Sequence, residues 1–449
     1  MVVEIKADRH CDCQFCKNNN GFTLPNEIIE AAKSRQLVVF AGAGVSTESK
    51  KVYTKSLYTE ICLELGINSN AGLSFSELMS IFCNQNNGRS KLLRKIKDRI
   101  DYVYSFPELY SRAADFHREL STIEQVRDIV TTNWDDLFER ECGATPFINA
   151  EDFIFWESAD RRVLKIHGSI NNYGSIVATE EDYKKCYKSL STGLIGSHLK
   201  MILATKLVVF CGYSFGDEDF TKIYNSLIKE MKGLMPHSYI VTIDSDAVDK
   251  FKNLNMTPIV TDATFFIESL KSHLVGEGVL IDDSRFIGAY DKLDELNNVH
   301  RVFSSLIKPR KEPEAIYNLC YQDGLKHAFE RMIALRKNGH YSHECNVTQM
   351  IQNYNQRRKE KKSKKIYHDE AYIDGYLNGL IFFLADDEHR EHMPLYYIYG
   401  YKGSIYNIQE YMELIEDSNN LHKQALRYAE SIVSRSSDDE IVFHHTPFL

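Results

Sequence analysis

The sequence has few of the features that mark fibrous, secreted or membrane proteins. Only 9 of its 449 residues are proline and 23 are glycine, which excludes collagen-like and long disordered segments. No apolar run approaches the ~20 residues that cross a bilayer, so we expect no membrane span. Residues 1–17 lack the apolar core of a secretory signal. We therefore expect a cytoplasmic protein.

Positive charge is also in short supply. The chain has 54 Lys and Arg against 63 Asp and Glu, a net charge of -9, which argues against an evenly basic nucleic-acid surface. One segment differs: Arg357–Lys365 reads RRKEKKSKK, with seven basic residues and one acidic residue. We favour a solvated helix face or loop. The alternative is contact with DNA, for which the flanking Tyr354 and Tyr367 offer base-stacking surfaces.

Most of the ten cysteines stand singly in apolar runs, where a reduced Cys behaves as a small hydrophobe. Cys11, Cys13 and Cys16 are the exception, with His10 beside them. Thiolates and imidazole are zinc ligands, but Cys11 and Cys13 are too close for the usual chelate and no second CxxC follows. We favour a thiol-rich arm without metal.

Short β-rich runs alternate with amphipathic helical stretches between residues 24 and 275. The predicted strands are Leu37–Phe40, Asp128–Thr131, Val163–Ile166, Lys206–Phe210, Tyr239–Ile243 and Pro258–Thr261. Near-continuous apolar runs of this kind predict a parallel sheet covered on both faces, and hence an α/β, doubly wound fold. Helices predicted over Lys55–Leu65, Phe75–Cys83 and Phe106–Leu120 form an insert between the first two strands.

The composition predicts three parts. Residues 1–23 form the cysteine-rich arm, residues 24–275 the α/β domain, and residues 276–449 a mostly helical domain rich in Leu, Tyr and Lys at helical spacing. Within the last part, the pairs His389/His392 and His444/His445 lack a third convincing ligand, and we expect surface histidines. The ATPase signature GxxxxGK[ST] is absent.

The first predicted strand leads directly into Ala41-Gly42-Ala43-Gly44-Val45-Ser46. Strand, Gly-x-Gly and then helix is an arrangement that brings backbone N–H groups to a phosphate. The usual dinucleotide fingerprint is incomplete, because Thr47 stands at the third glycine position and Cys62 falls where an acidic ribose ligand should end a second strand. An ordinary Rossmann dehydrogenase therefore fits poorly.

Polar residues follow four later strands, at the edge where open α/β sheets bind ligands. Thr131–Asp136 reads TTNWDD; its Asn and Asp suit either ribose and water binding or a helix N-cap. His167 in KIHGS is placed to act as a general base, although a lone His is more often structural. Cys211–Asp219 reads CGYSFGDED, and Asp244 ends the next strand as either a ribose ligand or a turn residue.

Taken in this order, GAGVS, TTNWD, KIHGS and GYSFGDED resemble the sirtuin family, in particular its zinc-less bacterial defence branch. The resemblance covers residues 24–275. It implies that NAD is bound by Gly42, Ala43, Gly44, Ser46, Thr132, Gly212, Ser214 and Asp244. It also implies that His167 is the catalytic base and that Asn133 and Asp135 lie beside the nicotinamide ribose.

Two departures from the family alter the expected reaction. Deacylating sirtuins carry CxxC…CxxC after the HG motif, whereas only Cys186 lies between His167 and Cys211 here. The family's GxPDFR segment is also replaced, by Glu48–Tyr53. Both absences count against protein deacylation and leave water as the natural nucleophile. We therefore predict hydrolysis of NAD, as substrate, to nicotinamide and ADP-ribose.

In the defence branch, such a chain resembles the partner of HerA-type hexameric ATPases. The resemblance implies a homo-oligomer docked on an ATPase ring that lowers cellular NAD during phage infection. The alternatives are a nucleic-acid-binding or nuclease subunit of the same kind of complex, acting through Arg357–Lys365, and an NAD-dependent protein deacylase or ADP-ribosyltransferase.

Overall fold

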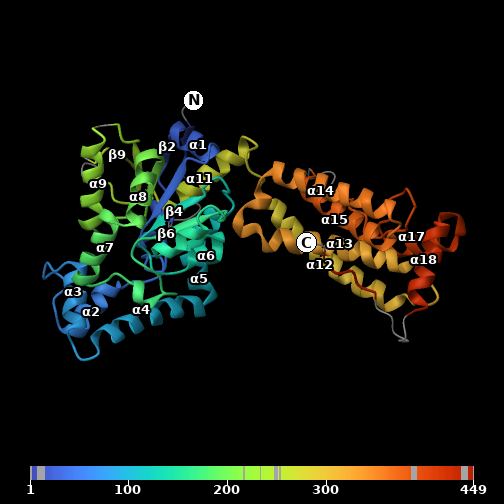
Figure 1. Ribbon diagram of the computed structural model, residues 1–449, viewed down its shortest axis with the longest axis horizontal. Helices are drawn as coiled ribbons and strands as arrows, with labels where there is room; N and C mark the ends of the chain where they lie inside the picture. Colours follow the sequence, from blue (N-terminus) through green and yellow to red (C-terminus); the bar gives the residue numbers. More distant parts are fainter. Residues whose placement is uncertain are drawn as a thin grey trace. The chain divides into compact units, whose positions relative to one another are not determined.

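The computed structural model describes residues 3–7, 16–215, 218–232, 234–246, 251, 254–385, 392–435 and 443–447. The chain divides into two units. The first comprises Met1–Val279 with Lys337–Gly339, and the second Leu280–Arg336 with His340–Leu449 (Figure 1). Within the described residues, every helix is too short or too polar to cross a membrane.

A seven-stranded sheet organises the first unit, with every neighbouring pair parallel and the strand order β5-β6-β4-β3-β7-β8-β9. The strands are β3 (Leu37–Ala41), β4 (Asp128–Thr131), β5 (Thr145–Phe147), β6 (Arg162–Lys165), β7 (Leu207–Cys211), β8 (Ser238–Thr242) and β9 (Met256–Val260). The predicted α/β, doubly wound class is confirmed. Sequence analysis missed β5, a three-residue edge strand whose central residue is Pro146.

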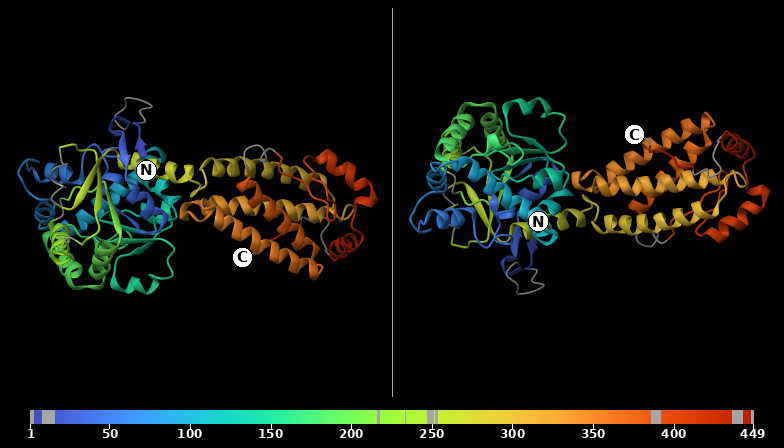
Figure 2. Two further views of the ribbon diagram at one scale, coloured as in Figure 1. Left: turned by 90° about the horizontal axis from the view of Figure 1, so that it is seen from above. Right: turned by 90° about the horizontal axis from the view of Figure 1, so that it is seen from below.

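Helices cover both faces of this sheet (Figures 1 and 2). They are α1 (Asn26–Lys33), α6 (Leu137–Cys142), α7 (Glu180–Thr192), α8 (Leu194–Thr205), α9 (Glu218–Glu230) and α11 (Ala263–Gly276). All five residues of β3 are buried, and Val38 and Phe40 share one core cluster with side chains of α7, α8 and α9. Burial on both faces is why the predicted strands read as continuous apolar runs.

The helical insert contains α2 (Leu57–Leu65), α3 (Phe75–Cys83), α4 (Gly88–Ser105) and α5 (Pro107–Ser121). The predictions for α2, α3 and α5 are confirmed within two residues at each end. Sequence analysis missed α4, whose Lys- and Arg-rich face obscures a buried stripe at helical spacing: Leu92, Ile96, Ile100 and Val103.

The N-terminal arm forms a two-stranded antiparallel hairpin of β1 (Val3–Ile5) and β2 (Phe22–Leu24). Backbone oxygens of Asn18 and Asn20 accept hydrogen bonds from the Asp262 amide and the Thr261 hydroxyl, so the arm is attached just beyond β9. Cys16 begins a short 3-10 turn, whereas Cys11 and Cys13 lie outside the described residues.

The second unit is helical, as predicted. It contains α12 (Ser284–Leu306), α13 (Ala315–Ala334), α14 (Glu344–Ser363), α15 (Tyr367–Leu384), α17 (Ile408–Glu416) and α18 (Lys423–Val433). Residues 315–325 of α13 are all buried, which makes this helix the centre of the unit. Large fully buried side chains in and around this helix include Tyr317, Tyr321, Tyr341, Tyr372, Tyr376 and Tyr411.

One expectation about the histidine pairs is wrong. The His445 side chain is only 7% exposed, and its Nε2 lies 3.1 Å from a carboxylate oxygen of Asp369. His444 is exposed, but its Nδ1 lies 3.4 Å from Asp323. Asp369 of α15 and Asp323 of α13 thus give these histidines acidic neighbours that the local sequence does not show. His389 lies outside the described residues, and His392 is exposed as expected.

Helices α13 and α15 approach each other closely at two glycines. A Cβ added to Gly375 would lie 1.9 Å from the Tyr321 carbonyl oxygen, and one added to Gly324 would lie 2.0 Å from that of Tyr372. Any side chain at either position forces the two backbones apart. Glycine is therefore required here for packing, at the cost of helix propensity.

We expect Gly375→Ala to destabilise the helical unit by about 1–3 kcal/mol, because the new methyl group overpacks the α13–α15 contact. Gly276→Ala in α11 is the matched control, since its added Cβ meets no atom within 4 Å. Urea unfolding followed by circular dichroism measures both variants. Equal unfolding midpoints for the two variants would contradict the packing argument.

Candidate functional site

The predicted site residues follow five adjacent strands at one edge of the sheet. Thr131 pairs with both Ala41 and Lys165 in the parallel ladders, so positions 43, 133 and 167 stand two residues beyond paired strand ends. Adjacent strands are about 4.8 Å apart. The sheet register therefore brings the glycine loop, Asn133 and His167 together from segments far apart in the sequence.

The glycine loop packs directly on the turn that follows β7. The Gly42 amide donates to the Cys211 carbonyl at 2.9 Å, and the Gly44 amide donates to the Gly212 carbonyl at 3.0 Å. A Cβ on Gly42 would lie 2.5 Å from the Gly212 oxygen. Gly212 itself has φ of +61°, which favours glycine. These glycines are therefore required by the contact between the two turns, whatever else they bind.

The loop is not followed by a long helix. Ala43–Val45 forms a single 3-10 turn, and α2 begins only at Leu57. The strand–glycine–helix arrangement considered from the sequence is thus wrong in its last element. Two of the loop amides, those of Gly42 and Gly44, already have acceptors on the β7 turn.

Asn133 is 6% exposed and anchored to the glycine loop. Its Nδ2 donates to the Gly42 carbonyl at 3.0 Å, and its backbone amide donates to the Thr131 hydroxyl. The Thr131 hydroxyl in turn donates to the Ala41 carbonyl. The amide group is thereby oriented, and its Oδ1 is a buried acceptor without a hydrogen-bond partner among the described residues. Such an atom is costly unless a ligand or water donates to it.

Asp135 connects the two loops. One carboxylate oxygen accepts from the Ser46 hydroxyl at 2.5 Å and from the Thr47 hydroxyl at 3.4 Å. The other accepts from the Leu137 amide, an N-terminal contact to α6. All three donors belong to the protein, so Asp135 holds Ser46 in place. The helix N-terminus interpretation of TTNWD therefore describes part of its geometry, and a role in binding ribose or water stays a prediction.

Lys165 is a buried cation beneath these loops that sequence analysis did not assign. Its side chain is fully buried, and its Nζ donates to the Asp135 carbonyl and pairs with Glu139 at 2.9 Å. Burial raises the pKa of Glu139, against the effect of Lys165. The available signal was a Lys that ends a buried strand two residues before His167.

His167 follows β6 and is 6% exposed. Its ring meets the Tyr183 ring edge-on, with centroids 5.2 Å apart, and its carbonyl accepts from the Val177 amide. These contacts fix both the ring and the backbone. His167 therefore enters the site from a rigid turn, as a general base requires.

The remaining predicted residues line the same edge. Thr132 is half-buried and its amide donates to the Ala41 carbonyl, whereas Ser214 is exposed beyond β7. Asp244 is exposed two residues beyond β8, where one oxygen accepts from the Asp246 amide. Asp244 thus completes a turn, and its role toward a ribose stays a prediction.

Arg99 holds the segment that replaces the family's GxPDFR motif. Its guanidinium forms two 2.8 Å hydrogen bonds to Glu48 and one of 2.5 Å to Glu60, and it stacks on Tyr53 at 3.8 Å. Arg99 is only 7% exposed. Sequence analysis missed this contact because the partners lie 39 or more residues away, although Arg99 continues the buried stripe of α4.

Asp136 joins the helical insert to the site. It accepts hydrogen bonds from Tyr104 at 2.6 Å, Arg140 at 2.9 Å and Asn171 at 3.3 Å. Burial opposes ionisation, but the Arg140 and Tyr104 hydrogen bonds outweigh it and lower the pKa of Asp136. Its neighbour Trp134 packs against Phe75 of α3. The TTNWDD segment therefore contacts both the insert and the loop after His167.

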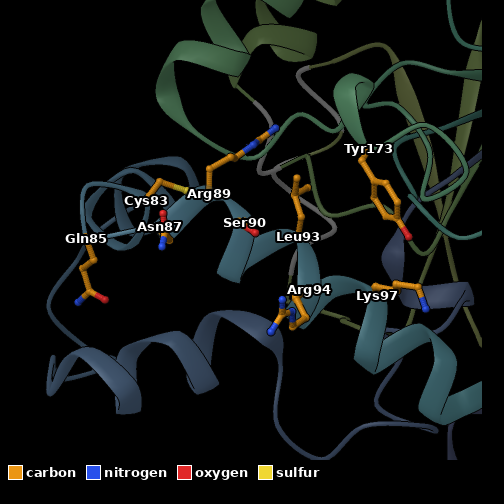
Figure 3. Close-up of a pocket in the computed structure, with 10 residues that line it drawn as sticks. Cys83, Gln85, Asn87, Arg89, Ser90, Leu93, Arg94, Lys97 and Tyr173 are labelled. Carbon is orange, nitrogen blue, oxygen red and sulfur yellow. The ribbon is translucent and has the colours of Figure 1, made fainter.

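A cavity of about 760 Å³ lies on the helical insert, and the residues that line it do not include the predicted site residues. Figure 3 shows that most of its side chains come from α4 and the turn before it, whereas Tyr173 comes from the loop after His167. Arg89 from this cavity donates to the Ile176 carbonyl and pairs with Asp182, each at 2.7 Å. The insert thus holds the segment that follows His167 and the start of α7.

We expect Arg99→Met to loosen the Glu48–Tyr53 segment, since Glu48 and Glu60 lose their shared cation. Trypsin should then cleave after Lys50, Lys51 and Lys55 several times faster than in the wild type. Mass spectrometry of a limited digest measures the cleavage. Arg94→Met is the matched control, because Arg94 is an exposed residue of the same helix. Equal cleavage in both variants would show that Arg99 does not order this segment.

Comparison with known proteins supports the sequence resemblance for part of the chain. Residues 127–259 match a family model described as SIR2-like domain. The match runs from the residue before β4 into β9 and contains Asn133, Asp135, His167, Gly212 and Asp244.

Relatives with curated names extend this similarity. The chain is 29% identical over 204 residues to NAD(+) hydrolase ThsA of Enterococcus faecium, covering 44% of this chain and 41% of that protein. It is 24% identical over 293 residues to Defense-associated sirtuin 2 of Bacillus subtilis, covering 63% of this chain and 27% of that protein. The matches thus span less than half of either relative.

A solved structure, from "Structural Basis for the Mechanism and Regulation of Sir2 Enzymes", aligns with a TM-score of 0.30 and 13% identity. The alignment covers 56% of this chain and 99% of that one. The residues that match the SIR2-like family model, 127–259, lie inside the span of 24–275 for which the sequence resembles sirtuins.

Proposed function

We propose that this chain hydrolyses NAD to nicotinamide and ADP-ribose as an effector of anti-phage defence. The observation that carries the proposal is the buried Oδ1 of Asn133, which is oriented by the Gly42 contact and has no hydrogen-bond donor among the described residues. Asn133 and His167 each stand two residues beyond the paired ends of the neighbouring strands β4 and β6. The names of the curated relatives, NAD(+) hydrolase and Defense-associated sirtuin, point to the same substrate and setting.

The reaction breaks the bond between nicotinamide nitrogen and ribose C1′. The bonding electron pair leaves with nicotinamide, and positive charge develops on the ribose. A water oxygen then bonds to C1′ and loses one proton. Such a reaction needs positioning, charge stabilisation and a base.

In this mechanism, Asn133 Oδ1 accepts a hydrogen bond from the ribose or from the attacking water. His167 accepts the proton of that water or of a ribose hydroxyl. Asp135 is a positioning residue, since its oxygens accept from Ser46, Thr47 and the Leu137 amide. The glycine loop, Thr132, Gly212, Ser214 and Asp244 bind the rest of the dinucleotide.

Water is the proposed nucleophile because the segment after His167 makes packing contacts here in place of a zinc module. Cys186, the single cysteine between His167 and Cys211, is buried and donates to the Ile166 carbonyl. Arg89 and Tyr173 connect the same segment to the helical insert. In deacylating sirtuins, a zinc module built on CxxC pairs helps to frame the acyl-lysine cleft. This segment lacks the cysteine ligands for such a module.

The partner of the enzyme is a further part of the proposal. We assign residues 276–449 to oligomerisation and to docking on a HerA-type hexameric ATPase. Size-exclusion chromatography with light scattering, with and without the ATPase, tests this step. A monomer that does not co-elute with the ATPase would remove the partner from the proposal and leave NAD hydrolysis standing.

We expect Asn133→Ala to lower the rate of nicotinamide release ~10²–10³-fold, because the oriented acceptor is lost. His167→Ala should lower it ~10²–10⁴-fold through loss of the base. Liquid chromatography of nicotinamide measures both rates. Asn68→Ala and His392→Ala are matched controls on exposed residues and should retain the wild-type rate.

The same assay separates the alternative reactions. It is run with NAD alone, with an acylated peptide, with DNA, and with the ATPase. Nicotinamide release without peptide supports the hydrolase. Release only in the presence of a peptide would replace it with a deacylase or ADP-ribosyltransferase.

A further inference from the structure

Two histidines and one aspartate converge in the helical unit, far along the chain from the candidate site. They are His300 of α12, Asp323 of α13 and His444 of the segment 443–447. One ligand atom of each lies within 4.8 Å of the others. His300 is 6% exposed and Asp323 is 3% exposed, whereas His444 borders the solvent.

The protonation of His300 follows from its neighbours. Gln322 Nε2 donates to the Leu395 carbonyl at 3.0 Å, which fixes the amide and leaves Oε1 as an acceptor. His300 Nδ1 lies 3.1 Å from that Oε1 and must donate its proton there. In the neutral ring, the tautomer that makes this hydrogen bond has no proton on Nε2. Nε2 therefore carries a lone pair.

This lone pair has no hydrogen-bond donor among the described residues. His300 Nε2 lies 3.8 Å from a carboxylate oxygen of Asp323. Two electron-rich atoms thus face each other in a buried site. Buried arrangements of this kind are unfavourable unless a cation or a donor lies between the atoms.

The two oxygens of Asp323 differ in their contacts. Oδ2 accepts from the His445 amide at 2.8 Å. Oδ1 faces both His300 Nε2 and His444 Nδ1, and His444 Nδ1 lies 3.4 Å from each of the two oxygens. Oδ1 is therefore the oxygen that points between the two imidazoles, whose ring centroids are 5.1 Å apart.

We propose that His300 Nε2, Asp323 Oδ1 and His444 Nδ1 bind a zinc ion. Zinc takes imidazole nitrogen and carboxylate oxygen at about 2.0–2.2 Å in a tetrahedral arrangement. A hydrogen bond from the second ring nitrogen, as His300 gives to Gln322, is the usual support of a zinc-binding histidine. The exposed side of His444 leaves the fourth position to water.

A neighbouring group, His368, Asp369 and His445, does not need a metal. Lys361 Nζ lies 2.6 Å from one oxygen of Asp369, and both His368 and His445 lie 3.1 Å from the other. Lys361 already supplies a cation there. The two groups share the segment 443–447, so the zinc fixes this segment onto α12 and α13.

The test uses the full-length chain with Cys11→Ser, Cys13→Ser and Cys16→Ser, which removes the thiols of the arm. Zinc content after dialysis is measured by mass spectrometry, and affinity by competition with a chromogenic chelator. We expect one zinc per chain. His444→Ala should weaken zinc binding more than ~10-fold, since even supporting contacts are worth 10–100-fold. His444 is exposed, so this variant should fold.

Two controls locate the site. His392→Ala removes another exposed histidine of the helical unit and should leave zinc binding unchanged, as should His368→Ala in the neighbouring group. Hydrogen exchange of residues 443–447 should slow with zinc in the parent chain but not in His444→Ala. Absence of bound zinc, equal binding by His444→Ala, or loss with His368→Ala alone would each overturn the assignment. None of these outcomes depends on NAD hydrolysis.

Discussion

The contact between two glycine turns governs the geometry of the candidate site. The Gly42 and Gly44 amides extend the β3–β7 ladder beyond the ends of both strands, and there is no room for a Cβ on either side. Because Gly42 is held in this way, its carbonyl is a fixed acceptor for Asn133. The orientation of the proposed catalytic amide thus derives from a backbone contact one strand away.

Further polar contacts, made by Asp135 and Lys165, hold the loop that carries Asn133. Asp135 ties the Ser46 hydroxyl to the start of α6, and Lys165 pairs with Glu139 under the same turn. Removing one partner of a buried pair leaves the other charge unpaired, which costs about 3–5 kcal/mol. The loop that carries Asn133 is therefore rigid because its supports depend on one another. Such rigidity suits catalysis by preorganised groups.

The sequence predicted what depends on local pattern. The strands were found because burial on both faces leaves continuous apolar runs, and the strand-end polar residues lie together at one edge of the sheet. Contacts that join distant segments could not be predicted. Arg99 contacts Glu48, which is 51 residues away in the sequence, and His444 contacts Asp323, which is 121 residues away. Neither partner can be chosen from spacing alone, because the helices between them set the distance.

The basic segment Arg357–Lys365 illustrates the same limit for charge. In the sequence it is a concentrated positive run, but Arg358, Lys361 and Lys362 each lie within 4 Å of an acidic residue of α15: Asp374, Asp369 and Glu370. Those acids are buried or half-buried, so their charges need these cations. A DNA phosphate would have to compete with carboxylates already in place. These three of the segment's seven cations therefore support the packing of α14 on α15.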